Sequence, residues 1–403
     1  MTAQDAEVQS SPLAADHRQL DSSPLIVFAG GGTGGHLYPA LAIMQALRGL
    51  LPDVRFLFFS STREIDSRIL TQADVEPVRQ PLVPLSRLPW RWPNVLRRFR
   101  ESSRLCRALF DKDRPAVVVG TGGLASVPAV LEAVRAGVPT ALLNPDLLPG
   151  RANRLLSRRV NVIFAQWSDT ISHLRSRAHV IVSGCPVRPE FTRSDRSAGL
   201  QRFGLQAGRK TLLITGASQG ARSINQAVVA NLDFLESRPD WQVLHLTGHA
   251  DFEAMERAYR NRSIPAAVMP FTEHMADALA VADIVVSRAG ASTLAEITAV
   301  GRASILMPYP YHRDKHQWAN AECLVRAGAA RILRDAVTPA VNGPALRQTL
   351  EPLMADEKAR QSIAAAARRI GRPDAASQIA RSLVSLMLPS SPAANLDPVQ
   401  AFC

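Results

Sequence analysis

Cysteine, acidic residues and long apolar runs are all scarce in this sequence. The four cysteines lie far apart and form no C-x-x-C pair, so the sequence suggests neither a zinc site nor a disulfide framework and fits a reducing cytoplasm. No stretch approaches about 18 uninterrupted apolar residues, so no membrane-spanning helix is expected. Residues 1–23 are polar and lack an apolar core, which argues against a signal peptide and favours a disordered leader.

The shortage of acidic residues leaves the chain strongly basic. Lys and Arg number 47 against 35 Asp and Glu, which gives a formal net charge of +12. An excess of this size favours contact with something anionic, such as a nucleotide, a nucleic acid or an acidic membrane surface. Charge alone does not choose among these partners.

Strand-like apolar runs separated by helical patterns fill both halves of the chain. With 46% hydrophobic residues over 403 positions, the chain can bury two cores and is too long for one ordinary domain. The runs are apolar on both faces, which is typical of βαβ units and of a parallel sheet covered by helices. They are residues 25–30, 54–61, 116–123, 139–144, 160–166 and 178–184 in the first half, and 211–218, 241–248, 266–271, 282–290 and 304–309 in the second.

The predicted fold class is therefore α/β, with two doubly wound, Rossmann-like domains. A stretch rich in proline, glycine and basic residues, without a strand pattern, separates the halves and is interpreted as a linker. The expected parts are a leader at 1–23, a first domain at 24–186, a linker at 187–208, a second domain at 209–370, a helix at 371–388 that is a candidate for packing back on the first domain, and a loose tail at 389–403.

Each half places a glycine-rich turn directly after its first strand, GGGTGG in the first half and TGASQGA in the second. Glycine lets the backbone take positive φ and approach a ligand closely, and the following helix directs its N–H groups and positive dipole end at that ligand. An anionic phosphate is the natural ligand of such a turn. Parallel-sheet proteins also use glycine there for packing alone, so one such turn leaves both interpretations open.

The first turn also matches the G-x-G-x-x-G pattern of dinucleotide-binding proteins, with Gly30, Gly32 and Gly35. That function needs an acidic residue about 20 positions later, at the end of the second strand, to hold a ribose. The strand ends FFSSTRE, with serine and threonine where the acid is expected, although Glu64 follows. The absence of an acid at this position weakens the prediction of an NAD-dependent oxidoreductase, which remains an alternative.

His36 follows the glycines, where the next helix is predicted to begin. The positive end of a helix disfavours the charged form of histidine, so we expect a neutral ring that accepts a proton near neutral pH. His36 is a candidate general base. The alternative is a structural histidine that is bonded to a backbone carbonyl.

Two polar clusters follow strands of the second half. In SRAGASTLAEI (287–297), Ser292 and Thr293 can cap a helix with Glu296 one turn in, and a capping box alone would explain part of this pattern. Polar groups at the carboxyl end of a parallel strand also predict a ligand crevice. Those of YPYHRDKHQWANA (309–321) are Asp314, Lys315, His316, Gln317 and Asn320.

The chain resembles the bacterial lipid I N-acetylglucosaminyltransferases of peptidoglycan synthesis, the MurG family, in six motifs that occur in the same order. These are GGTGGHLYPALA, VVVGTGG, SGCPVRPEF, TGASQGARSINQ, PFTEHMADALAVADIVVSRAGASTLAEI and DKHQWANA. The resemblance covers nearly all of residues 25–335. It implies the GT-B arrangement, in which two Rossmann-like domains face each other across a cleft, with no metal or other cofactor required.

The resemblance also implies a reaction, the inverting transfer of GlcNAc from UDP-GlcNAc to the C4 hydroxyl of MurNAc in undecaprenyl-pyrophosphoryl-MurNAc-pentapeptide (lipid I). Thr33, Gly34 and Gly35 match a loop that faces the donor sugar and the acceptor pyrophosphate, and His36 matches the candidate base. The positions that match donor contacts are Asp146, Arg188, Ser218, Thr272, Ala291, Ser292, Thr293, Leu294, Ala295, Glu296, His316 and Gln317. Among these, the family's counterpart of Thr272 meets the uracil, that of Glu296 binds the ribose hydroxyls, and that of Gln317 holds a GlcNAc hydroxyl.

Two stretches depart from the family pattern. Residues 143–146 read Leu-Asn-Pro-Asp where the family usually reads His-Glu-Gln-Asn, so Asp146 stands in the place of an asparagine that contacts the donor sugar. Leu124 stands where an aromatic residue is usual. Both changes lie on the acceptor side, so a UDP-sugar transferase that acts on another lipid or metabolite remains an alternative.

The stretch 86–114 predicts contact with a membrane. It holds nine basic residues against three acidic ones, interleaved with Trp90, Trp92 and Phe99. This composition suits the surface of an anionic bilayer, where a polyprenyl acceptor would be met, although a solvated basic helix explains such a run equally well. The expected location is the cytoplasmic face of the membrane, as a peripheral protein. The expected partners are UDP-GlcNAc, lipid I and the membrane, with cell-wall or division proteins as further candidates and no nucleic acid.

Overall fold

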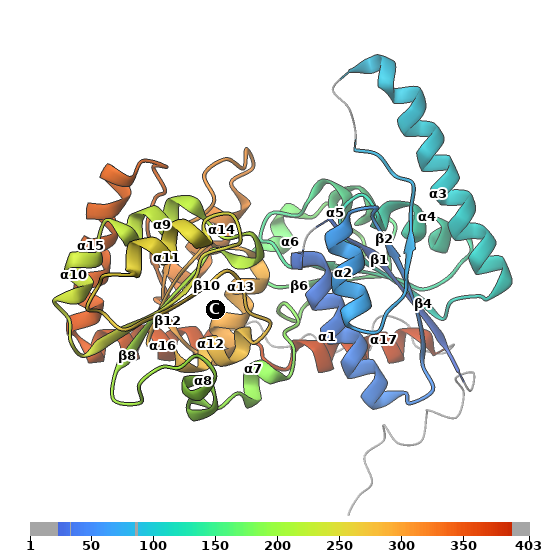
Figure 1. Cartoon of the computed structure of the whole chain (residues 1–403). Coiled ribbons are helices and arrows are strands. Elements are labelled where there is room, and N and C mark those ends of the chain that lie inside the picture. Colours follow the sequence, from blue (N-terminus) through green and yellow to red (C-terminus); the bar gives the residue numbers. More distant parts are fainter. Residues whose placement is uncertain (1–22, 33, 85–87, 389–403) are drawn as a thin grey trace, which may run out of the picture.

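Two parallel sheets, each covered by helices on both faces, form the two halves of the molecule (Figure 1). The structure is a computed structural model that describes residues 23–32, 34–84 and 88–388. The predicted tail, Thr33 and all but the last residue of the predicted leader lie outside the described residues.

The first sheet contains the strands β1 (Leu25–Gly30), β2 (Arg55–Ser60), β3 (Pro77–Arg79), β4 (Val117–Gly122), β5 (Thr140–Asn144), β6 (Val162–Ala165) and β7 (His179–Val182). The second contains β8 (Lys210–Thr215), β9 (Trp241–Leu246), β10 (Ala266–Met269), β11 (Ile284–Ser287), β12 (Ala303–Leu306) and β13 (Arg331–Ile332). Every pairing between neighbouring strands in the described residues is parallel. The sequence missed only the short strands β3 and β13, which lie at the edges of the sheets.

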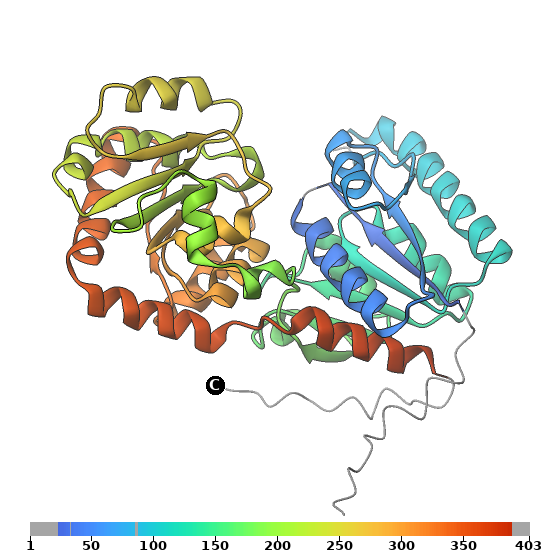
Figure 2. The ribbon, with the colours of Figure 1, turned by 60° about the horizontal axis from the view of Figure 1, so that its bottom comes forward.

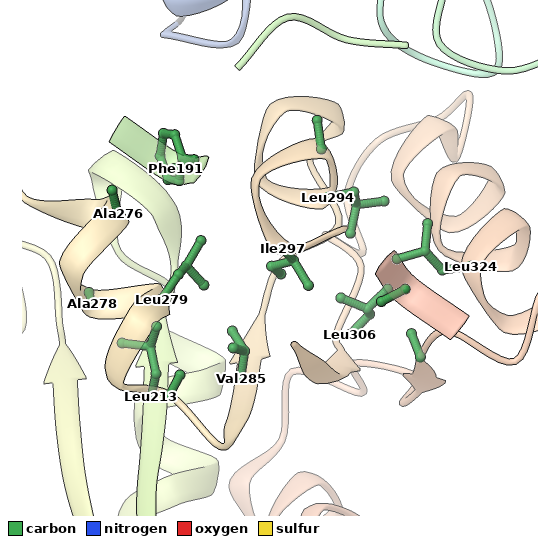
Figure 3. Close-up of a cluster of buried hydrophobic side chains, with 14 of the residues drawn as sticks. Phe191, Leu213, Ala276, Ala278, Leu279, Val285, Leu294, Ile297, Leu306 and Leu324 are labelled. Carbon is green, nitrogen blue, oxygen red and sulfur yellow. The ribbon is translucent and has the colours of Figure 1, made fainter. Parts of the chain in front are cut away.

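Side chains of β1 alternate between two cores because successive residues of a strand point to opposite faces of the sheet. Ile26 and Phe28 join a cluster with the helix α1 (Gly34–Leu50), whereas Val27 and Ala29 join a second cluster on the other face. The second sheet also has a cluster on each face, and Figure 3 shows one of them, in which Leu213 packs with other buried side chains. This two-sided burial explains why the strands read as continuous apolar runs.

The strand orders place the glycine-rich turns at two equivalent points. The first sheet has the order β3-β2-β1-β4-β5-β6-β7 and the second the order β10-β9-β8-β11-β12-β13. The order therefore reverses between β1 and β4, and again between β8 and β11. The chain leaves the carboxyl ends of these four strands through GGGTGG, GTGG, GASQG and RAGAS. Crevices at such switch points are where open α/β sheets bind ligands.

Helices connect the strands of both units. Those of the first unit, besides α1, are α2 (Glu64–Gln72), η3 (Pro89–Arg91), α3 (Trp92–Lys112), α4 (Ser126–Arg135), α5 (Arg151–Leu156) and α6 (Thr170–His173). Those of the second unit are η4 (Ala217–Gln219), α9 (Arg222–Val229), α10 (Leu232–Glu236), α11 (Phe252–Tyr259), α12 (Met275–Val281), α13 (Ala291–Val300), α14 (His316–Arg326), α15 (Pro339–Ala355) and α16 (Glu357–Ile370).

The chain crosses between the two units twice. The stretch interpreted as a linker forms α7 (Glu190–Arg193) and α8 (Arg196–Arg202), which pack against α12 of the second unit. After α16, the chain returns as α17 (Ala375–Met387), which packs against α1, as Figure 2 shows along the lower edge of the molecule. Ile379 and Leu383 of α17 are fully buried in the α1 cluster. The last helix therefore completes the core of the first unit.

Candidate active site

A cleft of about 910 Å³ lies between the two units, at the carboxyl ends of the strands that flank the switch points. Residues of both units line it, so neither half of the chain forms this cleft alone. The predicted site residues that line the cleft are Gly34, Gly35, His36, Asp146, Arg188, Thr272, Ala291, Ser292, Thr293, Glu296, His316 and Gln317.

The glycine turn after β1 is held in place by a buried carboxylate. Gly31 and Gly32 have φ angles of 142° and 90°, which side chains rarely tolerate. The N–H of Gly32 donates to both oxygens of Asp66, at 2.9 and 2.8 Å, and the hydroxyl of Ser61 donates to the same carboxylate. A Cβ on Gly31 would lie 2.3 Å from Asp66 Oδ2. Glycine is therefore required by the approach of Asp66 as well as by the backbone angle.

Asp66 was not predicted from the sequence. An acid was expected at the end of the second strand, and Glu64 was the residue considered. The structure places Asp66 in the first turn of α2, fully buried, with its carboxylate bonded to the turn. A signal was present, since α2 begins with two acidic residues shortly after Ser61. The sequence did not indicate which of the two faces the glycines, because that depends on the angle between α2 and the sheet.

His36 is the third residue of α1, and its ring lies against the second glycine turn. Its Nδ1 is 2.9 Å from the carbonyl oxygen of Gly31, so Nδ1 carries the proton and, in the neutral ring, Nε2 holds the lone pair. A Cβ on Gly122 would lie 2.9 Å from His36 Nε2, and Gly122 has a φ of 112°. The glycine at the end of β4 thus leaves room for this ring. The structure therefore shows the backbone-bonded histidine, and the general base stays a prediction, with Nε2 as the nitrogen concerned.

Two helix N-termini meet in the cleft. The hydroxyl of Ser292, in the first turn of α13, donates to the carbonyl of Gly35, in the first turn of α1, at 3.4 Å. The N–H groups in the first turn of a helix have no acceptor within that helix, and the helix dipole adds positive charge at this end. The two N-termini come from different units and are directed at one space. That space is suited to an anionic group such as a diphosphate.

Arg188 adds a full positive charge beside α13. Its guanidinium carbon lies 5.2 Å from the ring centre of Tyr38 on α1 and 5.4 Å from that of Phe191 on α7, and its Nη1 lies 3.0 Å from Glu190. The two aromatic rings hold the guanidinium between the units. Arg188 can therefore attract an anion without a further ordering cost.

Glu296 carries the strongest electrostatic perturbation among the predicted site residues. Burial raises the pKa of its carboxyl to about 7, Arg188 opposes this shift, and Glu190 reinforces it. Desolvation therefore outweighs the attraction of the nearby guanidinium. A carboxylate in this state gains from hydrogen-bond donors on a ligand, such as a pair of hydroxyl groups.

The segment before α14 and the first turn of that helix gather polar groups that line the cleft. Gln317 Oε1 accepts from the backbone N–H of Ala289 at 3.3 Å and of Tyr309 at 2.9 Å, so its amide nitrogen is left to donate to a ligand. His316 Nδ1 lies 2.8 Å from Asp314 Oδ1, and its ring stacks on His312 with 4.3 Å between ring centres. His312 also lines the cleft, although the sequence argument did not single it out.

The glycine turn after β8 closes against the turn after β9. A Cβ on Gly216 would lie 2.1 Å from the backbone nitrogen of Ala221, and one on Gly220 would lie 2.3 Å from the carbonyl oxygen of Thr247. Residues of this turn and Thr272, which follows β10, also line the cleft. Ser218 lies within this turn, in η4, but its side chain is outside what the structure describes.

Three residues singled out in the sequence face away from the cleft. Leu294 and Ala295 are buried in the core of the second unit, since they lie on the inner face of α13, and the N–H of Leu294 already donates to Gly290 within the helix at 3.0 Å. Leu124 packs against the core of the first unit. In α13, the N–H groups of the first turn, Ala291 to Thr293, are therefore the ones left to face an anionic ligand.

Comparison with known proteins gives consistent matches over both units. The glycosyltransferase family 28 N-terminal domain matches residues 26–165, and the C-terminal domain of that family matches residues 211–379. A relative from Desulforamulus reducens is 33% identical over 90% of this chain and 98% of its own length. One from Desulfitobacterium hafniense is 36% identical over 88% of this chain and 97% of its own length. Both are named UDP-N-acetylglucosamine--N-acetylmuramyl-(pentapeptide) pyrophosphoryl-undecaprenol N-acetylglucosamine transferase.

A solved structure gives the same result for the fold. The crystal structure of Acinetobacter baumannii MurG aligns with a TM-score of 0.71 at 24% identity, covering 90% of this chain and 99% of that one. The predicted GT-B architecture of two Rossmann-like units is confirmed.

The contact between Asp66 and the glycine turn can be tested by replacing the carboxylate with an amide. In Asp66→Asn, an amide nitrogen replaces one carboxylate oxygen, and this nitrogen cannot accept from Gly32 N–H or from the Ser61 hydroxyl. The remaining oxygen carries no charge, so the turn loses charge-assisted bonds. We expect the free energy of unfolding to fall by about 1–3 kcal/mol, measured by urea unfolding followed by circular dichroism. Glu64→Gln, in the same helix turn but exposed, is the matched control and should change it by less than about 0.5 kcal/mol. Equal effects of the two substitutions would contradict the assignment.

Proposed function

The chain belongs to glycosyltransferase family 28, and we propose that it transfers GlcNAc from UDP-GlcNAc to the C4 hydroxyl of MurNAc in undecaprenyl-pyrophosphoryl-MurNAc-pentapeptide, the lipid I to lipid II step of peptidoglycan synthesis. One observation carries this proposal: two helix N-termini from opposite units meet beside His36, in a chain whose relatives bear the name of that transferase. Membership of the family sets aside the oxidoreductase alternative.

In the proposed reaction, the acceptor oxygen attacks C1 of GlcNAc from the face opposite to the diphosphate, which inverts the configuration at C1. A sugar hydroxyl is a poor nucleophile, so its proton must leave as the bond from C1 to the diphosphate oxygen lengthens. His36 Nε2 receives this proton. The bond from Nδ1–H to the carbonyl of Gly31 then stabilises the imidazolium that forms, since both ring nitrogens carry protons in that state.

The departing UDP takes the electron pair of the broken bond and gains negative charge on its diphosphate. The first-turn N–H groups of α13 and the guanidinium of Arg188 are fixed before the reaction, so they stabilise this charge without reorganising. Glu296 accepts from the ribose hydroxyls, and the amide nitrogen of Gln317 donates to a hydroxyl of GlcNAc. The backbone at Thr272, which lines the cleft, meets the uracil.

We further propose that the chain binds an anionic membrane through η3 and the first turns of α3. Trp90 and Trp92 are 72% and 55% exposed, which is unusual for tryptophan, and Leu96 is 48% exposed beside them. The second half of α3 is anchored, with Phe110 buried and Arg107 paired to the buried Glu132 at 3.0 Å. In Figure 1, the N-terminal end of α3 projects away from the rest of the first unit. None of the helices in the described residues is long and apolar enough to span a bilayer.

The transfer reaction is tested with UDP-GlcNAc and a short-chain lipid I analogue. We expect the wild-type chain to form the disaccharide product, measured by chromatography and mass spectrometry. His36→Ala should lower kcat by roughly 10²- to 10⁴-fold, because the proton then has no acceptor, while the Kd for UDP changes little. No transfer by the wild type, under conditions in which a known lipid I transferase is active, would refute the function. Transfer to another lipid acceptor instead would favour the alternative of a changed acceptor.

The role of Glu296 predicts a pH dependence of donor binding. The carboxyl has a pKa of about 7 in the free protein, and only its ionised form accepts from the two ribose hydroxyls with both oxygens, so lowering the pH through 7 protonates it and weakens binding. Between pH 8 and pH 6, the Kd for UDP-GlcNAc should rise roughly tenfold, measured by isothermal titration calorimetry. UDP-GlcNAc is the right probe because its diphosphate has no terminal group that titrates in this range. Glu296→Gln should bind more weakly at pH 8 and lose the pH dependence; the same slope in both proteins would disprove the role.

The membrane proposal is tested by co-sedimentation with vesicles of phosphatidylglycerol and phosphatidylcholine. Trp90→Ser together with Trp92→Ser should weaken binding at least roughly tenfold, since two large apolar groups no longer enter the interface. Val341→Ser, at a residue that is 55% exposed in the second unit, is the control and should leave binding unchanged. Transfer to a short-chain, water-soluble acceptor should be normal in all three proteins. Equal vesicle binding by all of them would contradict the proposed surface.

A further inference from the structure

Asn320 joins the two units through a buried amide. It lies in the second turn of α14 and is fully buried. Its Oδ1 accepts from the backbone N–H of Leu147 at 2.8 Å, and its Nδ2 donates to Asp146 Oδ1 at 2.8 Å. Both partners belong to the loop after β5, on the acceptor side of the cleft. One side chain of the donor unit is therefore bonded twice to the opposite unit.

The same amide also reaches the start of the donor helix. Asn320 Nδ2 lies 3.4 Å from the carbonyl oxygen of Ala289, and Gln317 Oε1 accepts from the N–H of Ala289 at 3.3 Å. Ala289 is two residues before Ala291, the first residue of α13. The side chains of Gln317 and Asn320 thus contact the N–H and the C=O of Ala289, just before the N-terminus of α13 that faces the diphosphate. Movement of Asn320 would be transmitted to that N-terminus.

The loop that meets Asn320 is rigid on its own side. Asn144 Nδ2 donates to the carbonyl of Asp146 at 2.7 Å, and Asn153 Nδ2 donates to the carbonyl of Leu143 and to Asn144 Oδ1, both at 3.0 Å. Asn144 and Asn153 are both buried. These bonds involve residues 143–146, the stretch at which the sequence departs from the family pattern. The changed stretch therefore builds a fixed support for the contact with Asn320.

The chemistry of residue 146 fixes the direction of the amide. An ionised carboxylate only accepts hydrogen bonds, so Asn320 must turn its nitrogen toward Asp146 and its oxygen toward Leu147 N–H. In this orientation each polar atom of the buried amide is satisfied, which matters because an unsatisfied buried group is costly. Of the other polar contacts between the units, the ion pair of Arg326 with Asp169 at 2.7 Å is exposed and contributes little, and the bond from Ser292 to Gly35 is longer, at 3.4 Å. The buried amide is the stronger connection.

From this geometry we infer that Asn320 is a positioning residue for transfer and that Asp146 acts through it. The pair sets the N-terminus of α13, and with it the leaving diphosphate, relative to the acceptor-side loop when the cleft is closed. The inference rests on the proposed transferase function for its kinetic consequence. Because UDP contacts mainly the second unit, breaking the pair should lower kcat and leave the Kd for UDP nearly unchanged.

An exchange of the two side chains tests the pair. In Asn320→Asp, two carboxylates face each other, so kcat should fall roughly ten- to a hundredfold, as expected when reacting groups are misplaced. In Asp146→Asn, two amides can still pair, so kcat should fall by less than in Asn320→Asp. In the double variant D146N/N320D, the donor and the acceptor have changed places, and kcat should recover to within about threefold of wild type. The Kd for UDP should stay within about twofold in all three variants.

Each result decides between the pair and its alternatives. An inactive Asp146→Asn would mean that the carboxylate acts on the substrate itself, and a double variant no better than Asn320→Asp would mean that the two residues are not coupled. Either result overturns the inference. Arg326→Gln, which removes the exposed contact between the units, is the control and should retain full activity. The thermal unfolding midpoint of every variant separates loss of positioning from loss of folding.

A second readout needs no activity. Small-angle X-ray scattering in the presence of UDP should give a larger radius of gyration for Asn320→Asp than for wild type, because the cleft is held less closely. The double variant should return it to the wild-type value. If the wild type transfers nothing but this pattern is seen, the transferase function fails and the connection stands. If the wild type is active and the double variant recovers neither kcat nor the radius, the connection alone fails.

Discussion

Two helix N-termini directed at one space impose the arrangement of the whole cleft. The positive ends of α1 and α13 repel each other unless an anion lies between them, yet Ser292 Oγ and the carbonyl of Gly35 are 3.4 Å apart. The approach depends on turns without side chains. Gly31 and Gly32 take positive φ, and at Gly122 a side chain would collide with the ring of His36. The glycines thus place the proposed anion site and the proposed base together, as the transfer of a sugar from a diphosphate would require.

The sequence predicted the parts that depend on local pattern and missed those that depend on angles between elements. Buried strands were found because both of their faces are apolar, whereas β3 and β13 were missed because a strand of two or three residues with proline or arginine carries no such pattern. The glycine turns and His36 were found because they adjoin strands. Asp66 and the contact of Asp146 with Asn320 were not, since the pairs of atoms involved are brought together only by the packing of helices.

The charged groups of the cleft are arranged so that a bound ligand would supply their missing partners. Glu296 lies near Arg188, but burial has the larger effect on its pKa, and Arg188 also pairs with Glu190 at 3.0 Å. Glu190 thus compensates part of the charge of Arg188, and the carboxylate form of Glu296 is disfavoured by its burial. In the proposed complex, a diphosphate with a ribose would supply an anion to Arg188 and the helix ends, and hydroxyl donors to Glu296. The same arrangement would bind a simple phosphate less well, because the carboxylate would repel it.

The two crossings of the chain explain why contacts across the cleft are needed. Gly184, after β7, lies so close to the return crossing that a Cβ there would be 2.5 Å from the Cβ of Arg372. Beyond this point, α17 is buried against α1 and cannot separate from the first unit without exposing Ile379 and Leu383. The units are thus joined at one place, and a rotation about that place would open the cleft. The bonds from Asn320 to the loop after β5, and from Ser292 to Gly35, oppose this rotation at the site where the reacting groups must meet.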